Sequence, residues 1–188
     1  MNYWLARKQR IFFITGEISE ATDVLEIASE IIRLNKIERK VPKDQLKPIY
    51  IFIDSEGGVL DDSMYFADLI LASRIPVYTI ATGICMSAAT LILLAGKKRF
   101  AFPHSQVLIH TGSAVLSGTS RQVEEAQKNY KHQLDLMKDY IIKHTKIDTK
   151  LFNKNKSKDW YLKEDELIPL GVVDEIVTDI DQIFDKED

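Results

Sequence analysis

Three short segments of the sequence carry side chains and backbone groups that could perform acyl-transfer chemistry. The first is Ser-Glu-Gly-Gly at 55–58, whose two glycines leave backbone N–H groups open to a ligand. The second is 83–89, where Ser87 follows Gly-Ile-Cys-Met and precedes a run of small apolar residues. The third ends at His110, which follows the apolar residues 107–109. A hydroxyl nucleophile, an imidazole base and accessible amide donors are the parts of a serine hydrolase.

Each segment also has an ordinary structural explanation. Glycine pairs are common in the turns of α/β proteins, and serine is a preferred N-cap residue of helices. His110, taken alone, is better explained as a satisfied core or surface histidine. Cys85 is a second candidate nucleophile, but its neighbours are apolar and nothing nearby would lower its pKa, so we interpret it as structural. The four histidines have no metal-ligand spacing, so we expect neither a metal nor a cofactor.

The elements that must position these residues alternate between strands and helices. Continuous apolar runs rich in β-branched residues are typical of strands buried on both faces of a parallel sheet. The expected strands are 11–14, 49–53, 77–80, 99–102, 107–109 and 171–177. One expected helix begins at Ser19 or Glu20, and another begins at residue 60. Further helices are expected over the later part of 84–95, over all of 121–146 and over 163–170. A surface loop is expected at 35–47. This alternation predicts an α/β fold.

Length and composition fit one domain spanning 1–188 and exclude several classes of protein. With 25 Lys and Arg against 28 Asp and Glu, the net charge of −3 lacks the basic excess of a nucleic-acid-binding surface. One cysteine cannot form an internal disulfide, which fits a reducing compartment. The apolar run 88–95 is far shorter than the ~20 residues of a membrane-spanning helix. We therefore expect a cytoplasmic protein with no membrane and no nucleic-acid partner.

Taken in order, the segments resemble the proteolytic subunits of ATP-dependent Clp proteases, the ClpP family. Members of that family carry Ser-Pro-Gly-Gly, Gly-x-Ala-Ser-Met-Gly-Ala, Met-Ile-His-Gln-Pro, Asp-Arg-Phe-x-Ser and Glu-Ala-x-x-x-Gly-Leu-Ile-Asp segments. The corresponding stretches here are 55–58, 83–89, 108–110, 159–162 and 170–174. No single motif is specific, but five in the family's order, within residues 11 to 178, carry the resemblance.

The resemblance implies a serine endopeptidase with Ser87 as nucleophile, His110 as general base and Asp159 as the group that orients the imidazole. It also implies that the backbone amides of Gly58 and Ala88 form the oxyanion hole. Other carboxylates close to Asp159 in the sequence are Glu164, Asp165 and Asp174.

The implied fold is crotonase-like, with stacked β-β-α units and a projecting handle helix, the handle covering about 111–146. Members of the family form two stacked seven-membered rings, so we expect a homo-oligomer, a tetradecamer, that hydrolyses unfolded proteins or peptides inside it.

The sequence departs from the family pattern at several positions. Glu56 replaces the proline of the glycine turn, Thr111 replaces the glutamine after the histidine, and Ala-Ala-Thr at 88–90 replaces Met-Gly-Ala. Only ten residues precede the first expected strand. We therefore expect the family's pore-lining segment to be short or absent, which argues against a standard partnership with a Clp-type ATPase.

Three alternative functions stay open on the sequence. One is a non-catalytic ClpP-like ring subunit. Another is a signal-peptide-peptidase-like protease of the same fold, in which Lys97 or Lys98 would form a Ser–Lys dyad with Ser87. The third is a crotonase-type acyl-CoA enzyme, in which Gly58 and Ala88 would polarise a thioester.

Overall fold

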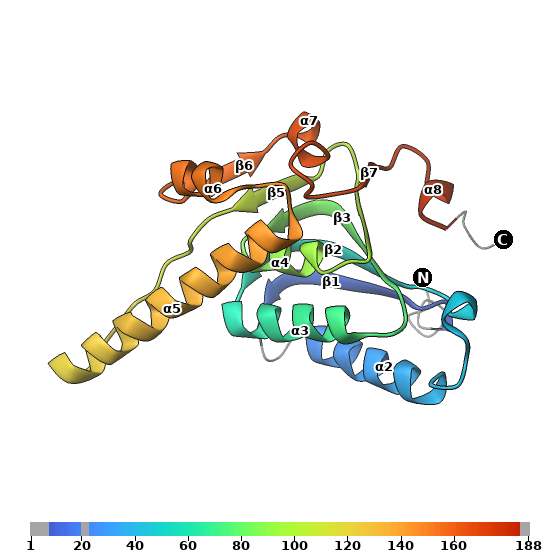
Figure 1. The fold of residues 1–188 in the computed structure, drawn as a ribbon, viewed down its shortest axis with the longest axis horizontal. Helices are drawn as coiled ribbons and strands as arrows, with labels where there is room; N and C mark the ends of the chain where they lie inside the picture. Colours follow the sequence, from blue (N-terminus) through green and yellow to red (C-terminus); the bar gives the residue numbers. More distant parts are fainter. Residues whose placement is uncertain (1–7, 20–22, 185–188) are drawn as a thin grey trace.

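The computed structural model describes residues 8–19 and 23–184, which form one seven-stranded sheet with helices around it (Figure 1). The central path of the sheet is parallel and consists of β1 (Ile11–Ile18), β2 (Ile49–Gly58), β3 (Val77–Met86), β4 (Lys98–Ala101) and β7 (Glu175–Ile176). Beyond the region paired with β4, β3 pairs in parallel with β5 (Gln106–Ile109), and β6 (Trp160–Leu162) adds to β5 in antiparallel orientation. The α/β class expected from the sequence is confirmed.

The helices are α2 (Asp23–Ile37), α3 (Leu60–Ala72), α4 (Ala88–Leu94), α5 (Ser120–His144), α6 (Thr149–Asn155), α7 (Glu164–Leu167) and α8 (Asp181–Phe184), with a short 3-10 helix η1 (Lys43–Gln45). Figure 1 shows α2 and α3 on one side of the sheet and α5 running out from the body of the molecule. This long helix agrees with the projecting helix that the family resemblance implies.

Strand β2 shows why a continuous apolar run forms the centre of this sheet. Ile49, Ile51 and Ile53 belong to the main core, whereas Tyr50 and Phe52 belong to a smaller core cluster with residues from β3, β4 and α8 and with Val177, which follows β7. Because successive side chains of a strand point to opposite faces, both faces of β2 are covered. The prediction of a doubly buried strand is confirmed.

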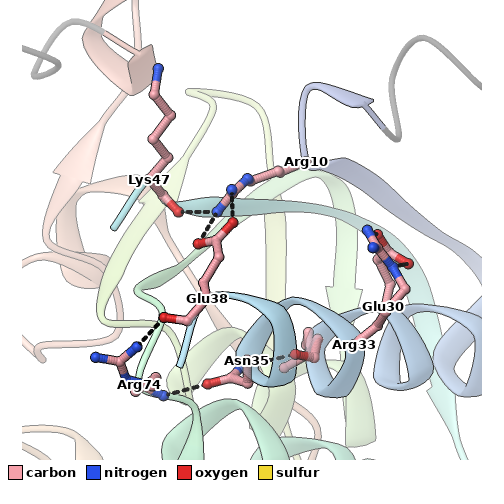
Figure 2. A network of polar contacts seen from close by, with 8 residues as sticks. Arg10, Glu30, Arg33, Asn35, Glu38, Lys47 and Arg74 are labelled. Carbon is pink, nitrogen blue, oxygen red and sulfur yellow. Dashed lines mark hydrogen bonds and ion pairs between the residues drawn. The ribbon is translucent and has the colours of Figure 1, made fainter. Parts of the chain in front are cut away.

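A polar network fixes the start of β1 against the end of α2 (Figure 2). Arg10 forms an ion pair with Glu38, and its guanidinium donates to the carbonyl oxygen of Lys47 at 2.8 Å. The backbone N–H of Arg74 donates to Asn35 Oδ1 at 2.9 Å, and the Arg74 side chain donates to the carbonyl oxygen of Glu38. These contacts lie at the end of the sheet where β1, β2 and β3 begin.

Two strands run further than the sequence predicts. The segment 55–58 was expected to end the second strand, but it continues β2, because Glu17 and Ile18 of β1 pair with Gly57 and Gly58. Strand β1 reaches that far because its register shifts around Gly16, whose φ of +74° suits glycine. Residues 84–86, expected outside the third strand, extend β3 because they pair with β5.

Other boundaries differ because pairing and packing override local propensity. The expected helix 163–170 is only α7, and the expected strand 171–177 is only β7. Helix α2 ends at Ile37, inside the expected loop, and η1 interrupts that loop. Helix α6 and strand β6 are additional elements. The expected helix start at Glu20, the acidic tail 185–188 and most of the short N-terminal segment lie outside the described residues.

Candidate active site

Strand topology brings the three candidate catalytic side chains to one edge of the sheet. Ser87 directly follows β3, and His110 directly follows β5. These strands are parallel neighbours, with Met86 opposite Leu108, so both side chains leave the sheet at the same end. Strand β6 is antiparallel to β5, so its beginning, which Asp159 precedes, lies at that end too. This is the carboxyl end of the parallel strands, where ligand sites of α/β sheets gather.

The three side chains form a continuous chain of polar contacts. Ser87 Oγ lies 2.7 Å from His110 Nε2. His110 Nδ1 lies 3.2 Å from Asp159 Oδ1. The side chain of His110 is 30% exposed, whereas that of Asp159 is 62% exposed, so the carboxylate is largely hydrated. The arrangement allows a proton to pass from the serine hydroxyl to the imidazole while the carboxylate holds the opposite ring nitrogen.

The backbone of Ser87 is in an unusual conformation. Its φ of 56° and ψ of −123° lie in a region that non-glycine residues rarely adopt. Such a conformation costs about 1–3 kcal/mol and persists only where the surroundings enforce it. Ser87 occupies the N-cap position of α4, but its side chain makes no capping hydrogen bond. The capping explanation of this serine is therefore wrong, because the hydroxyl is directed to His110.

A cavity of about 340 Å³ opens beside Ser87 and His110. Gly58 and Ala88, the expected oxyanion-hole residues, both line it. Its apolar wall comes from residues that follow β2 and from α5, namely Val59, Leu60, Tyr130, Leu134 and Met137. Asp159 does not border this cavity. It lines a separate hollow of about 150 Å³ on which His110 also borders, so the imidazole lies between the carboxylate of Asp159 and the hydroxyl of Ser87.

The glycine pair is required by two close approaches, of Gly57 to Met86 and Ser87 and of Gly58 to Ile18 of β1. A Cβ atom on Gly57 would lie 2.6 Å from the carbonyl oxygen of Met86 and 2.9 Å from Ser87 Cβ. A Cβ atom on Gly58 would lie 2.1 Å from the carbonyl oxygen of Ile18. Both glycines also have positive φ, 99° and 149°. They are therefore part of a strand end that passes between Ser87 and Ile18, and not an ordinary strand-to-helix turn.

Two features of the site were not identified from the sequence. The buried Ser55 donates to the carbonyl oxygen of Gly16 at 2.5 Å and accepts the N–H of Gly57 at 3.1 Å, which fixes the glycine segment. The apolar wall formed by α5 was also missed. The wall residues of α5 share one apolar face of the helix predicted at 121–146. The spacing of apolar residues predicts such a face, but it does not show that part of the face borders the site.

The other candidates in the sequence have different roles. Cys85 is fully buried, and burial raises the pKa of its thiol well above the usual range, so its interpretation as structural is confirmed. Lys98 is ion-paired with Glu175 and lies opposite Tyr78, at the end of β3 remote from Ser87. The backbone N–H of Lys97 donates to the carbonyl oxygen of Val77 at that same end of β3. A Ser–Lys dyad with Lys97 or Lys98 is therefore wrong.

The neighbouring carboxylates are also accounted for. Asp174 is paired with Arg99 at 2.8 Å, and Glu164 and Asp165 lie in the first turn of α7. Of the candidates named from the sequence, Asp159 is the carboxylate in contact with His110.

Residues 8–19 and 23–184 contain neither a metal-binding cluster nor a membrane-spanning helix. They contain no group of three or more His, Cys, Asp or Glu side chains arranged to hold a metal ion. No helix among them has the length and apolar character needed to cross a bilayer.

Comparison with known proteins gives a consistent family assignment. The family model described as Clp protease matches residues 2–180. The ATP-dependent Clp protease proteolytic subunit of Dehalococcoides mccartyi is 29% identical over 177 residues, covering 93% of this chain and 85% of that protein. The ATP-dependent Clp protease proteolytic subunit 2 of Treponema denticola is 31% identical over 179 residues, covering 94% of this chain and 86% of that protein.

Proposed function

The chain belongs to the Clp protease family, and from this premise we propose that it is a serine endopeptidase with a Ser87, His110 and Asp159 triad. One observation carries the proposal: Ser87 Oγ lies 2.7 Å from His110 Nε2 while its backbone is held in a strained conformation. A serine that only capped a helix would need neither feature.

The reaction follows from the order of these contacts. His110 Nε2 accepts the hydroxyl proton as Ser87 Oγ forms a bond to the carbonyl carbon of the substrate. The negative charge that develops on the carbonyl oxygen is stabilised by the backbone N–H groups of Gly58 and Ala88, both of which border the cavity. When the C–N bond breaks, His110 returns the proton to the leaving amine. Water then attacks the acyl-enzyme by the same route.

Asp159 acts on the far side of the imidazole. Its carboxylate accepts a hydrogen bond from His110 Nδ1–H, which leaves Nε2 free to receive the serine proton. It also stabilises the imidazolium that forms during attack.

The substrate is proposed to be an unfolded protein or peptide with an apolar residue before the cleaved bond. The cavity beside Ser87 holds about 340 Å³ and has an apolar wall, into which such a side chain would fit. The site lies at the open carboxyl ends of strands β3 and β5, where an extended polypeptide would fit. A folded protein presents such extended segments only in its loops.

We also propose that the protein works as a ring-shaped homo-oligomer of two stacked heptamers. Exposed apolar side chains support extensive subunit contacts, since several are more than 40% exposed in the single chain: Leu25, Ile32, Ile37, Tyr65, Leu71, Val115, Leu136, Tyr161 and Ile180. The relatives are named as subunits of ATP-dependent proteases, so a Clp-type ATPase is the partner to test. Light scattering after size-exclusion chromatography measures the oligomer, and a stable monomer would contradict it.

Labelling with a fluorophosphonate probe, together with hydrolysis of a fluorogenic peptide, tests the catalytic proposal. We expect covalent labelling of the wild type and none in Ser87→Ala or His110→Ala. Matched controls are Ser29→Ala and His132→Gln, which alter an exposed serine of α2 and an exposed histidine of α5, neither of which borders the cavity beside Ser87 or the hollow beside Asp159. A wild type that assembles into rings but neither labels nor hydrolyses peptide would favour a non-catalytic ring subunit.

A further inference from the structure

A buried hydroxyl group in α4 joins the two strands that carry the serine and the histidine. Thr90 is 1% exposed, and its Oγ1 lies 3.0 Å from the carbonyl oxygen of Cys85 and 2.9 Å from that of Leu108. Cys85 belongs to β3, and Leu108 belongs to β5. Thr90 is the one polar residue of this helix, whose other members are alanine, leucine and isoleucine. A hydroxyl in such surroundings costs free energy unless it is hydrogen-bonded.

The carbonyl oxygen of Leu108 receives two hydrogen bonds from the region of the nucleophile. The Ser87 N–H donates to it at 2.9 Å, and Thr90 Oγ1 donates at the same distance. A carbonyl oxygen has two lone pairs, so it can accept both. Leu108 is two residues before His110 on the same chain segment. This acceptor therefore links the segment that carries Ser87 to the segment that carries His110, in addition to the pairing of β3 with β5.

We propose that Thr90 is a positioning residue for Ser87 and His110, an inference that rests on the proposed function. Its single hydroxyl proton is shared between the carbonyl oxygens of Cys85 and Leu108, which lie on either side of the strained Ser87. This keeps the serine hydroxyl in line with the imidazole. The family segment has alanine at this position, so this hydroxyl is a feature of the present chain.

The substitution Thr90→Val removes the hydroxyl and keeps the volume of the side chain. Without Thr90 Oγ1, the carbonyl oxygen of Leu108 accepts a hydrogen bond from the Ser87 N–H but no longer from position 90. We expect kcat for a fluorogenic peptide to fall about tenfold, because small displacements of reacting groups slow a reaction strongly. KM should change less than about twofold, since Thr90 does not border the substrate cavity. Thr90→Ser restores a hydroxyl and should recover most of kcat.

Thr79→Val is the matched control. Thr79 is also fully buried, and its Oγ1 donates to the carbonyl oxygen of Leu93, which links β3 to the other end of α4. Each valine variant removes one buried hydroxyl donor, so thermal unfolding should show similar losses of stability. Only Thr90→Val should lose kcat.

If the two variants lose kcat equally, or if Thr90→Val keeps the kcat of the wild type, the positioning role is overturned while the proposed function stands. A ring-forming wild type with no peptidase activity overturns the proposed function itself, and the positioning role with it.

Discussion

Asp159 provides a quantitative test of the triad, because its carboxylate is unusually hydrated for a group in this role. The substitution Asp159→Asn removes the charge but keeps an oxygen that can accept a hydrogen bond from His110 Nδ1. Asp159→Ala removes both. Comparing the two separates the effect of charge on the imidazolium from the effect of orienting the ring.

The distance between His110 Nδ1 and Asp159 Oδ1, and the exposure of the Asp159 side chain, set the expected loss of activity when the charge of Asp159 is removed. Two unit charges at the 3.2 Å that separates His110 Nδ1 from Asp159 Oδ1 attract each other by about 1.3 kcal/mol in water and about 5 kcal/mol at an effective dielectric constant of 20. Because the Asp159 side chain is 62% exposed, the value should lie near the lower limit, at about 1.5–2 kcal/mol. This corresponds to a loss of about 10- to 30-fold in kcat/KM for Asp159→Asn. Asp159→Ala should lose more.

The assay is peptide hydrolysis by the assembled protein at low and at high salt. The advantage of wild type over Asp159→Asn should shrink as salt is added, because exposed charges are screened. The matched control is Asp165→Asn, an exposed carboxylate of the same C-terminal region that should leave kcat/KM unchanged. Two results would refute the reasoning. One is a salt-independent loss of about 10⁴-fold, as expected for a buried triad carboxylate. The other is unchanged activity of Asp159→Ala.

Four further experiments probe groups around the site. Ser87→Gly should abolish hydrolysis yet raise Tm by about 2–4 °C, by relieving about 1 kcal/mol of backbone strain. Calorimetry checks this, and a lower Tm argues against strain. Gly57→Ala, whose Cβ would approach Met86 and Ser87, should cost at least about 2 kcal/mol in urea unfolding and most of the activity. Wild-type kinetics would contradict this. Burial raises the pKa of Cys85, so only the unfolded thiol ionises above its ordinary pKa of about 8.5. Stability should therefore fall as pH rises past that value, less so in Cys85→Ala, and a native thiol that reacts rapidly with a disulfide reagent refutes its burial. Burial, with Lys143 and Arg99 nearby, lowers the pKa of His144, so stability should fall as pH drops through about 6.5. His144→Gln should flatten that slope and His132→Gln should not, as measured by thermal unfolding.

The positions of the site residues could be predicted because they lie at the ends of strongly marked strands. The apolar run before Ser87 and the one before His110 each specify a buried strand. Parallel strands in one sheet then bring their carboxyl ends together. The glycines at 57 and 58 were informative for a related reason, since no larger residue fits where β2 passes Ser87 at Gly57 and Ile18 of β1 at Gly58.

The elements that could not be predicted are those whose stability comes from distant partners. Strand β6 has only three residues, and what stabilises it is antiparallel pairing with β5 and burial of Trp160 and Leu162. The extension of β1 past Gly16 likewise depends on pairing with the end of β2. Local propensity carries no information on either partner, because tertiary context overrides it.

The antiparallel placement of β6 has a consequence for the order in which the protein becomes competent. During synthesis, a ribosome-bound chain that ends before Asp159 already contains β3, β5 and α5, and hence Ser87 and His110. It lacks the strand that covers β5 and the carboxylate that directly precedes that strand. Until then β5 is an open edge that other chains can pair with. When β6 emerges from the ribosome and pairs with β5, it covers this edge and brings Asp159 to the imidazole of His110. Protection of the β5 edge against pairing with other chains, and completion of the contacts among Ser87, His110 and Asp159, therefore occur in one step.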